Sequence, residues 1–163
     1  MDGRIEGYVV GFIDAEGSFS VSIKLQKGLR YGIRLDPVFS VTQREREPID
    51  TIIHMLNAGR IIRKPGQPHL YLLVIDSISE LIGKLIPFLE RNIDLLCAKK
   101  RQYILFRDIV RGLHEARHKD IGGMYDLVIK AYELSDLSMK SNRRRSLDDV
   151  LLMLKQWGPP GER

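Results

Sequence analysis

Polar and apolar residues alternate along two stretches near the start of the chain, and a period of two predicts β-strands with one polar and one apolar face. The first strand is expected at residues 18–26 and the second at 31–43, joined by a turn around 28–30. Pro37 falls inside the second strand. Because proline has no N–H to donate, we expect that strand to be bulged or to lie partly at an edge.

The other elements follow from helical periodicity and from capping residues. Over the first ninety residues the predicted order is α-β-β-α-β-β-α, with helices at 5–15, 49–57 and 77–89 and a second hairpin that pairs 60–64 with 69–75. The third helix is expected to open on a capping box, Ser77 to Glu80. Further helices are expected at 95–113, 121–134 and 146–157. We therefore predict one α+β domain over residues 1–163, with a core at about 5–90 and a helical part at about 93–158.

Composition narrows the class of protein. The chain has 163 residues, of which 44% are hydrophobic, which suits one globular domain and excludes a disordered chain. No apolar run approaches the roughly 20 residues that span a bilayer, and the N-terminus does not resemble a signal peptide. The single cysteine, Cys97, excludes a disulfide scaffold and is expected to be a small core residue. We expect no membrane partner and an intracellular location, in the cytoplasm of a prokaryote or in an organelle.

The net charge is +5, and the basic residues are concentrated in two regions. Lys and Arg outnumber Asp and Glu between residues 18 and 71, and 140–145 holds bases and no acid. Such a field favours a polyanionic partner, with ordinary solvated charge as the alternative.

The polar faces of the four strands mix hydrogen-bond donors and acceptors, as a surface that reads base edges in a major groove would. A strand of about eleven residues spans about 36 Å, close to one DNA turn of about 34 Å. The alternative is an ordinary sheet with one solvated face. The residues expected at DNA bases or phosphates are Ser20, Ser22, Lys24, Gln26, Lys27, Arg30, Tyr31, Arg34, Asp36, Ser40, Thr42, Arg44, Arg60, Arg63, Lys64, Gln67, His69, Tyr71, Lys140, Arg143, Arg144 and Arg145.

Two features of the first helix suggest functions other than packing within the chain, namely contact with another backbone and metal binding. Gly7 and Gly11 stand four residues apart on one face, which lets another backbone approach closely. Asp14 and Glu16 follow where the helix ends and the first strand begins. A carboxylate at that position can hold Mg²⁺, while the alternative is a pair of solubilising residues at a helix end.

The segment Val9-Val10-Gly11-Phe12-Ile13-Asp14-Ala15-Glu16-Gly17 resembles the signature of the LAGLIDADG homing endonucleases. Apart from Glu16, which stands where the motif has aspartate, its departures exchange one apolar residue for another. The predicted order of elements and the helical tail also match that family, so the likeness covers nearly the whole chain. One copy of the motif is present. Single-motif members act as homodimers with their motif helices packed at the two-fold axis, which implies a dimer interface at Gly7, Val10 and Gly11.

The resemblance also assigns roles at the reaction centre. It implies that Glu16 is the metal ligand, assisted by the backbone carbonyl of Ala15. Gln43 matches a glutamine that orients water near the scissile phosphate. Lys99 matches the lysine of the active site, with Lys100 as a close rival.

Two further positions are carried over from the family. A basic residue often stands four positions after the glutamine, where this chain has Glu47, and Arg46 is the candidate to replace it. The segment 138–145 corresponds to a loop that holds the DNA backbone.

The activity that the resemblance implies is metal-dependent hydrolysis of one phosphodiester on each strand of a pseudo-palindromic DNA target of about twenty base pairs. Two or three Mg²⁺ ions per dimer are expected, with one shared ion as an open alternative. A non-cleaving binder on the same scaffold, either an intron maturase or a transcriptional regulator, is the competing hypothesis. The host intron RNA is a second partner under the maturase alternative.

A different chemistry is suggested by His114-Glu115-Ala116-Arg117-His118, which fits the H-E-x-x-H pattern of zinc hydrolases, with Glu133 as a third ligand. The long helix is expected to end in this segment, which favours a solvent-facing loop over a zinc site. His54 is expected on a helix surface and His69 on the sheet face.

Overall fold

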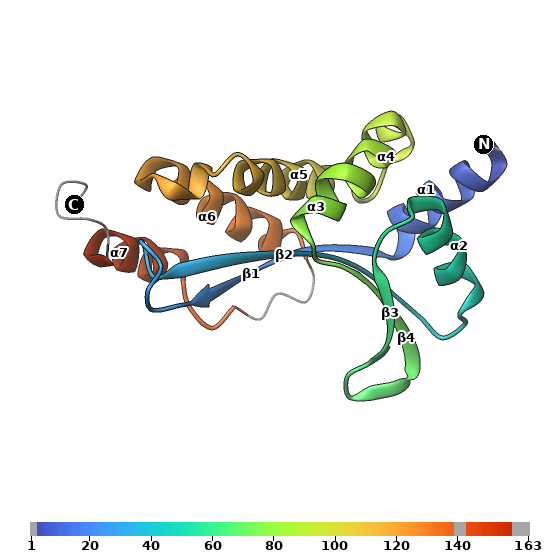
Figure 1. The fold of residues 1–163 in the computed structure, drawn as a ribbon, viewed down its shortest axis with the longest axis horizontal. Helices are drawn as coiled ribbons and strands as arrows, with labels where there is room; N and C mark the ends of the chain where they lie inside the picture. The colour runs from blue at the N-terminus through green and yellow to red at the C-terminus, as the bar shows by residue number, and fades with distance from the viewer. Residues whose placement is uncertain (1–2, 139–142, 158–163) are drawn as a thin grey trace. The chain divides into compact units, whose positions relative to one another are not determined.

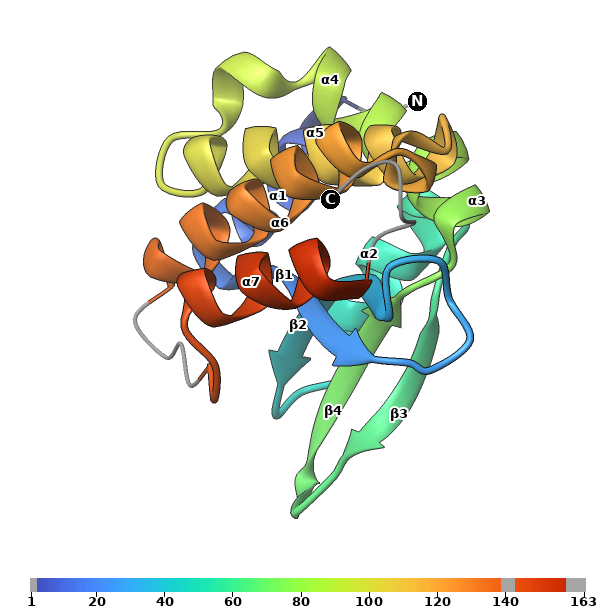
Figure 2. The same cartoon turned by 90° about the vertical axis from the view of Figure 1, so that its left-hand side faces the viewer.

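The computed structural model describes residues 3–138 and 143–157, and it confirms the predicted α+β order (Figures 1 and 2). The strands are β1 (Gly17–Leu25), β2 (Ile33–Gln43), β3 (Arg60–Lys64) and β4 (Gln67–Ile75), in one sheet of order β1-β2-β4-β3. The helices are α1 (Gly3–Glu16), α2 (Glu47–Leu56), α3 (Ile78–Glu80), α4 (Ile86–Arg91), α5 (Lys100–His114), α6 (Ile121–Asp136) and α7 (Leu147–Trp157). Short 3-10 turns cover Ile93–Leu95 and Arg117–Lys119, and a π-helical turn covers Leu81–Leu85.

The chain divides into two compact units. The first comprises residues 1–19 and 38–104, and the second comprises 20–37 and 105–163. The division cuts through β1, β2 and α5.

The core of the first unit forms where α1, α2 and the helical run 78–91 bury apolar side chains against the sheet. Phe39 pairs with Ile75 and Val41 with Leu73, and all four side chains are buried. Pro37 lies before the segment of β2 that pairs with β4, so its missing N–H breaks no bond to β4, as the partial-edge prediction requires.

Two local predictions in the first unit are wrong. Ser77 makes no side-chain cap, and Glu80 instead accepts a hydrogen bond from the N–H of Gly59 at 3.2 Å, so the capping box does not form. Cys97 is exposed and not part of the core. The helical run also contains a π-helical turn, Leu81–Leu85, shortly before Pro87. In a regular α-helix the proline ring would clash with the backbone carbonyl four residues earlier, and the wider turn lies at that place.

The second unit has its core between α5, α6 and α7. Asp120 caps α6 by accepting from the N–H of Gly123 at 2.8 Å, and Ser146 caps α7 by accepting from Asp149 at 3.1 Å. Tyr31 is 1% exposed and donates its hydroxyl to the carbonyl of Lys119 at 3.3 Å. The expectation that Tyr31 contacts DNA is therefore wrong.

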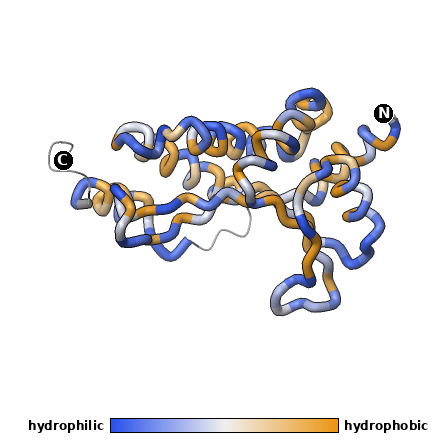
Figure 3. Tube along the Cα trace, in the orientation of Figure 1, coloured by the Kyte–Doolittle hydropathy of each residue, from blue (hydrophilic) through white to orange (hydrophobic). Residues whose placement is uncertain are grey.

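The alternation that predicted β1 and β2 is visible along the chain trace (Figure 3) and is matched by burial. In β1 the side chains of Phe19 and Val21 are buried, while Ser20 and Ser22 are exposed. Within the described ranges, no helix is long and apolar enough to cross a membrane.

Candidate active site

The end of α1 is tied to a loop that lies more than eighty residues later in the sequence. The Asp14 carboxylate accepts backbone hydrogen bonds from Cys97 at 3.0 Å, Ala98 at 3.0 Å and Lys99 at 2.9 Å. The carbonyl of Lys99 in turn accepts from the N–H of Tyr103 at 2.8 Å, which starts α5. The backbone of Lys99 is therefore fixed to a residue that precedes Glu16 by two positions on α1.

Gln43 lies at the same end of the β1–β2 hairpin as Glu16. β1 begins at Gly17, β2 ends at Gln43, and the two strands are neighbours in the sheet. A Cβ at Gly17 would lie 2.5 Å from the carbonyl oxygen of Ile13 and 3.2 Å from the ring of Phe39, so this junction requires glycine. The structure thus brings Glu16, Gln43 and Lys99 to one end of the first unit.

The exposure of these groups differs. Glu16 and Ala15 are exposed, whereas Gln43, Lys99 and Lys100 are half-buried. In residues 3–138 and 143–157, no group of three or more His, Cys, Asp or Glu side chains is placed to hold a metal ion.

Arg46 lies immediately before α2, and its side chain has a partner in that helix. Its Nε donates to the Asp50 carboxylate at 3.1 and 3.2 Å, and its guanidinium lies 6.0 Å from the ring centroid of Tyr71. Glu47 opens α2.

The strand register separates the polar residues of the first unit into two faces. Gln43 pairs with Tyr71 and Tyr71 with Arg63, so these three share the face of the buried Leu73 and its neighbours. The Arg63 guanidinium lies 3.8 Å from the ring centroid of Tyr71. Ser40 and Thr42 project from the opposite face, so the prediction that one polar face carries them together with Tyr71 and Arg63 is wrong.

The face with Ser40 and Thr42 is partly apolar on the second hairpin. Thr42 pairs with Leu72, and Ser40 with Val74. Arg60, opposite Val74, makes a two-pronged ion pair with Asp76 at 2.7 and 2.8 Å. That hydrogen bonding, against the opposing effect of partial burial, lowers the pKa of Asp76.

In the second unit, the exposed polar row of β1 and β2 carries a charge network. Lys24 lies 2.7 Å from Asp36, and Arg34 donates to Asp36 and to Gln26, each at 3.0 Å. Partial burial acts to raise the pKa of Asp36, but the hydrogen bonds from Lys24 and Arg34 outweigh it and lower the pKa. Gln26, Lys27 and the two cations are exposed, as expected of a DNA-facing surface.

The basic segment near the C-terminus divides into structural and exposed residues. Arg143 is half-buried, donates to the carbonyls of Val21 at 2.7 Å and Ala131 at 3.0 Å, and lies over the ring of Tyr132. Its predicted role at DNA is therefore wrong, because its guanidinium is occupied inside the unit. Arg144 and Arg145 are exposed, and Lys140 lies outside the described residues.

One face of α1 is open. A Cβ at Gly7 or Gly11 would meet no atom within 4 Å, and the neighbouring Ile5 and Tyr8 are 45% and 48% exposed. Val10 is fully buried, so the prediction that it lies in an interface is wrong.

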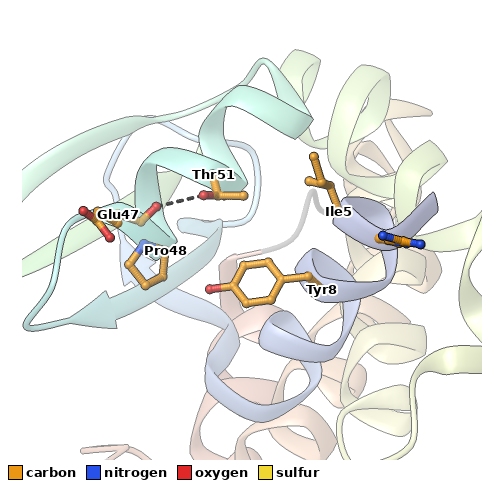
Figure 4. Close-up of a pocket in the computed structure, with 6 residues that line it drawn as sticks. Ile5, Tyr8, Glu47, Pro48 and Thr51 are labelled. Atoms are coloured by element: carbon orange, nitrogen blue, oxygen red, sulfur yellow. Dashed lines mark hydrogen bonds between the residues drawn. The ribbon is translucent and has the colours of Figure 1, made fainter. Parts of the chain in front are cut away.

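Tyr8 extends from α1 toward the start of α2 (Figure 4). It lines a shallow groove of about 450 Å³ formed by Arg4, Ile5, Tyr8, Glu47, Pro48 and Thr51.

The H-E-x-x-H segment does not form a helical pair of histidines. α5 ends at His114, and Ala116 has a left-handed backbone with φ of 59°. His118 follows in a 3-10 turn, so the two histidines do not share one helix face as a zinc hydrolase requires.

Comparison with known proteins identifies the relatives of this chain. The family model for LAGLIDADG endonucleases matches residues 9–110, a range that includes Glu16, Gln43 and Lys99. The chain is 44% identical over 164 residues to homing endonuclease I-ApeII of Aeropyrum pernix, covering 98% of this chain and 97% of that protein. It is 24% identical over 130 residues to DNA endonuclease I-CeuI of Chlamydomonas moewusii, covering 77% of this chain and 60% of that protein.

A solved structure gives the same result for the fold. The archaeal intron-encoded homing endonuclease I-Vdi141I, complexed with DNA, matches with a TM-score of 0.93 and 47% identity, covering 96% of this chain and 98% of that chain.

Proposed function

This chain belongs to the LAGLIDADG endonuclease family, and from that premise we propose that it is a homodimeric homing endonuclease that cuts both strands of one long, pseudo-palindromic DNA target. The observation that carries the proposal is the open face of α1, which leads directly to Glu16. Glycines on an exposed helix face allow the matching helix of a second copy to approach closely. Because a two-fold interface presents the same patch twice, such packing brings the two Glu16 side chains toward one axis.

The residues at the end of α1 suit a magnesium ion. Glu16 and the carbonyl of Ala15 offer oxygen ligands only, and Mg²⁺ binds with one or two carboxylates while keeping water and phosphate oxygens in its remaining positions. A dimer would contain two such ligand positions, one at each Glu16, and we propose that together they bind two or three Mg²⁺ ions. When bound, Mg²⁺ supplies activation of the attacking water and stabilisation of charge on the departing oxygen.

The other site residues act on the phosphate and on water. Gln43 has a donor and an acceptor on one amide group and can orient the attacking water. Lys99 carries a positive charge that offsets charge developing on the phosphate. Arg46 carries a positive charge next to α2, where it bonds Asp50 through Nε, and is proposed as the additional basic residue.

DNA contact is proposed for exposed and half-buried polar positions of the four strands and their adjoining turns, and for two basic residues that precede α7. These comprise Ser20, Ser22, Lys24, Gln26, Lys27, Arg30, Arg34, Asp36, Ser40, Thr42, Arg44, Arg60, Lys64, Gln67, His69, Arg144 and Arg145. Their mixture of donors, acceptors and cations matches base edges flanked by phosphates.

The test is selection from a randomised double-stranded DNA library with Mg²⁺ or with Ca²⁺, for the wild-type protein and for Glu16→Gln. We expect wild-type protein to cut one family of pseudo-palindromes with Mg²⁺, and Glu16→Gln to bind the same family without cutting it. Asp94→Asn, an exposed acid outside the proposed site, is the matched control and should cut as the wild type does. A target that is bound and never cut by the wild type would instead support the non-cleaving binder.

A further inference from the structure

The structure assigns a function to the first acid of the signature segment: we propose that Asp14 is a positioning residue that fixes Lys99 relative to Glu16. This inference rests on the proposed nuclease function. Both oxygens of the Asp14 carboxylate are used, Oδ1 by the N–H groups of Cys97 and Lys99 and Oδ2 by that of Ala98. The side chain is thereby directed at protein backbone and not at substrate.

The loop that Asp14 holds is anchored at its two ends by the buried Leu96 and by the bond from the N–H of Tyr103 to the carbonyl of Lys99, and Asp14 holds the backbone between them. Residues 96–99 belong to no helix or strand, and Cys97 and Ala98 are exposed. The preceding turn closes with a long bond of 3.3 Å from the N–H of Leu96 to the carbonyl of Ile93. Hydrogen bonds from amides to a carboxylate are about twice as strong as neutral ones, and Asp14 accepts three of them from consecutive residues, so it strongly restrains the backbone of residues 97–99.

The bonds to Asp14 hold Lys99 near the end of α1 that carries Glu16, so their loss should affect the reaction rate. Asp14 and Glu16 are two residues apart on one rigid helix, and Lys99 is bonded to Asp14 across 85 positions of sequence. The lysine is therefore set against the carboxylate end of α1 by these contacts. A displacement of about 1 Å in a reacting group can lower a rate by about 100-fold.

The variant that tests this is Asp14→Asn. Asparagine keeps the size and one acceptor oxygen, but the other atom becomes a donor that faces the N–H of Ala98. We expect kcat to fall by about 10- to 100-fold. The dissociation constant for the selected target, measured in Ca²⁺, and the Mg²⁺ concentration at half-maximal rate should both stay within threefold of the wild-type values.

Glu6→Gln is the matched control. Glu6 also lies on α1 and also accepts a hydrogen bond from a residue near the start of that loop, the side-chain amide of Asn92 at 2.8 Å, but it does not contact Lys99. We expect kcat of Glu6→Gln to equal that of the wild type. An equal loss of kcat in both variants would overturn the proposal, because the loss would then come from general docking of α1.

Amide hydrogen exchange in the wild-type protein tests the restraint without any variant. The N–H groups of Cys97, Ala98 and Lys99 should exchange more slowly than an unstructured chain although the loop is exposed, and exchange at the unstructured rate would overturn the proposal. Unchanged kcat in Asp14→Asn, or a raised Mg²⁺ requirement that places Asp14 at the metal, would also overturn it. The failure of this inference can be distinguished from the failure of the proposed function. If the wild-type protein cuts DNA and Asp14→Asn cuts it equally fast, only the role of Asp14 is refuted. If the wild-type protein never cuts DNA, the proposed function is refuted, and with it the reaction that Asp14 is proposed to serve.

Discussion

Replacing both Gly7 and Gly11 with alanine should stabilise the protomer and weaken the dimer. A Cβ at either position meets no atom within 4 Å inside the chain, so the protomer gains helix propensity without a clash. Alanine is favoured over glycine by about 0.8–1 kcal/mol per position in a helix, which gives roughly 2 kcal/mol for the pair. In the proposed homodimer the effect has the opposite sign, because the open face would become a contact.

The magnitude at the interface follows from symmetry. An extra methyl group in a close-packed contact costs about 1–3 kcal/mol, and a two-fold axis presents each substitution twice. One substituted position therefore costs about 2–6 kcal/mol per dimer. The lower end corresponds to a dissociation constant raised by roughly 30-fold.

Sedimentation equilibrium over a range of concentrations measures the dimer, and thermal unfolding at a concentration where the variant is monomeric measures the protomer. Cleavage should fall at low protein concentration and recover as concentration rises. Gly83→Ala is the control, since that glycine is also exposed in a helical run with open space around it. A double variant that remains as dimeric as the wild type would refute the assignment of this face. A less stable protomer would refute the argument from open space.

Three further outcomes are expected. Burial, followed by the charge of Lys119, lowers the pKa of His118 below its ordinary 6.5. The folded state therefore favours the neutral ring, so stability is lost as the pH falls from about 7 toward 5, and His118→Gln should flatten the urea-midpoint profile in that window. Gly59→Ala should cost about 2–4 kcal/mol in chemical denaturation, because φ is +85° and a Cβ would lie 2.7 Å from the carbonyl of Val74. Arg143→Met should cost about 1.5–3 kcal/mol through two lost charged hydrogen bonds, yet leave the salt dependence of DNA binding unchanged; a slope reduced by about one would instead identify a phosphate contact.

The parts of the fold that sequence predicts well are those with a local cause. Alternation along β1 and β2 depends only on each residue and its neighbours, and the buried Phe19 and exposed Ser20 follow it directly. The cap at Ser146 forms for the same reason, since the N–H that it accepts lies three residues away. The capping box at Ser77 fails because Glu80 finds a better-placed donor in Gly59, which is 21 residues distant in sequence.

Residues whose environment is set by distant partners could not be predicted in this way. Alternation assigns Tyr71 to a polar face, but only the pairing of β4 with β2 reveals that it shares a face with Gln43 and not with Thr42. A basic run gives Arg143 and Arg144 the same expected role. Packing of the segment onto α6 half-buries the first and leaves the second exposed.

The two acids of the signature show why chemistry alone cannot divide roles within a motif. Asp14 and Glu16 carry the same functional group, and on a helix residues two apart point about 200° from each other, so one direction cannot serve both. Helix geometry requires the two side chains to point in different directions, but it does not determine which of them contacts other parts of the protein. That choice depends on the backbone donors of residues 97–99, which bond to Asp14 and leave Glu16 exposed to solvent. A metal ligand must keep its oxygens available, so the acid without backbone partners is the one suited to Mg²⁺.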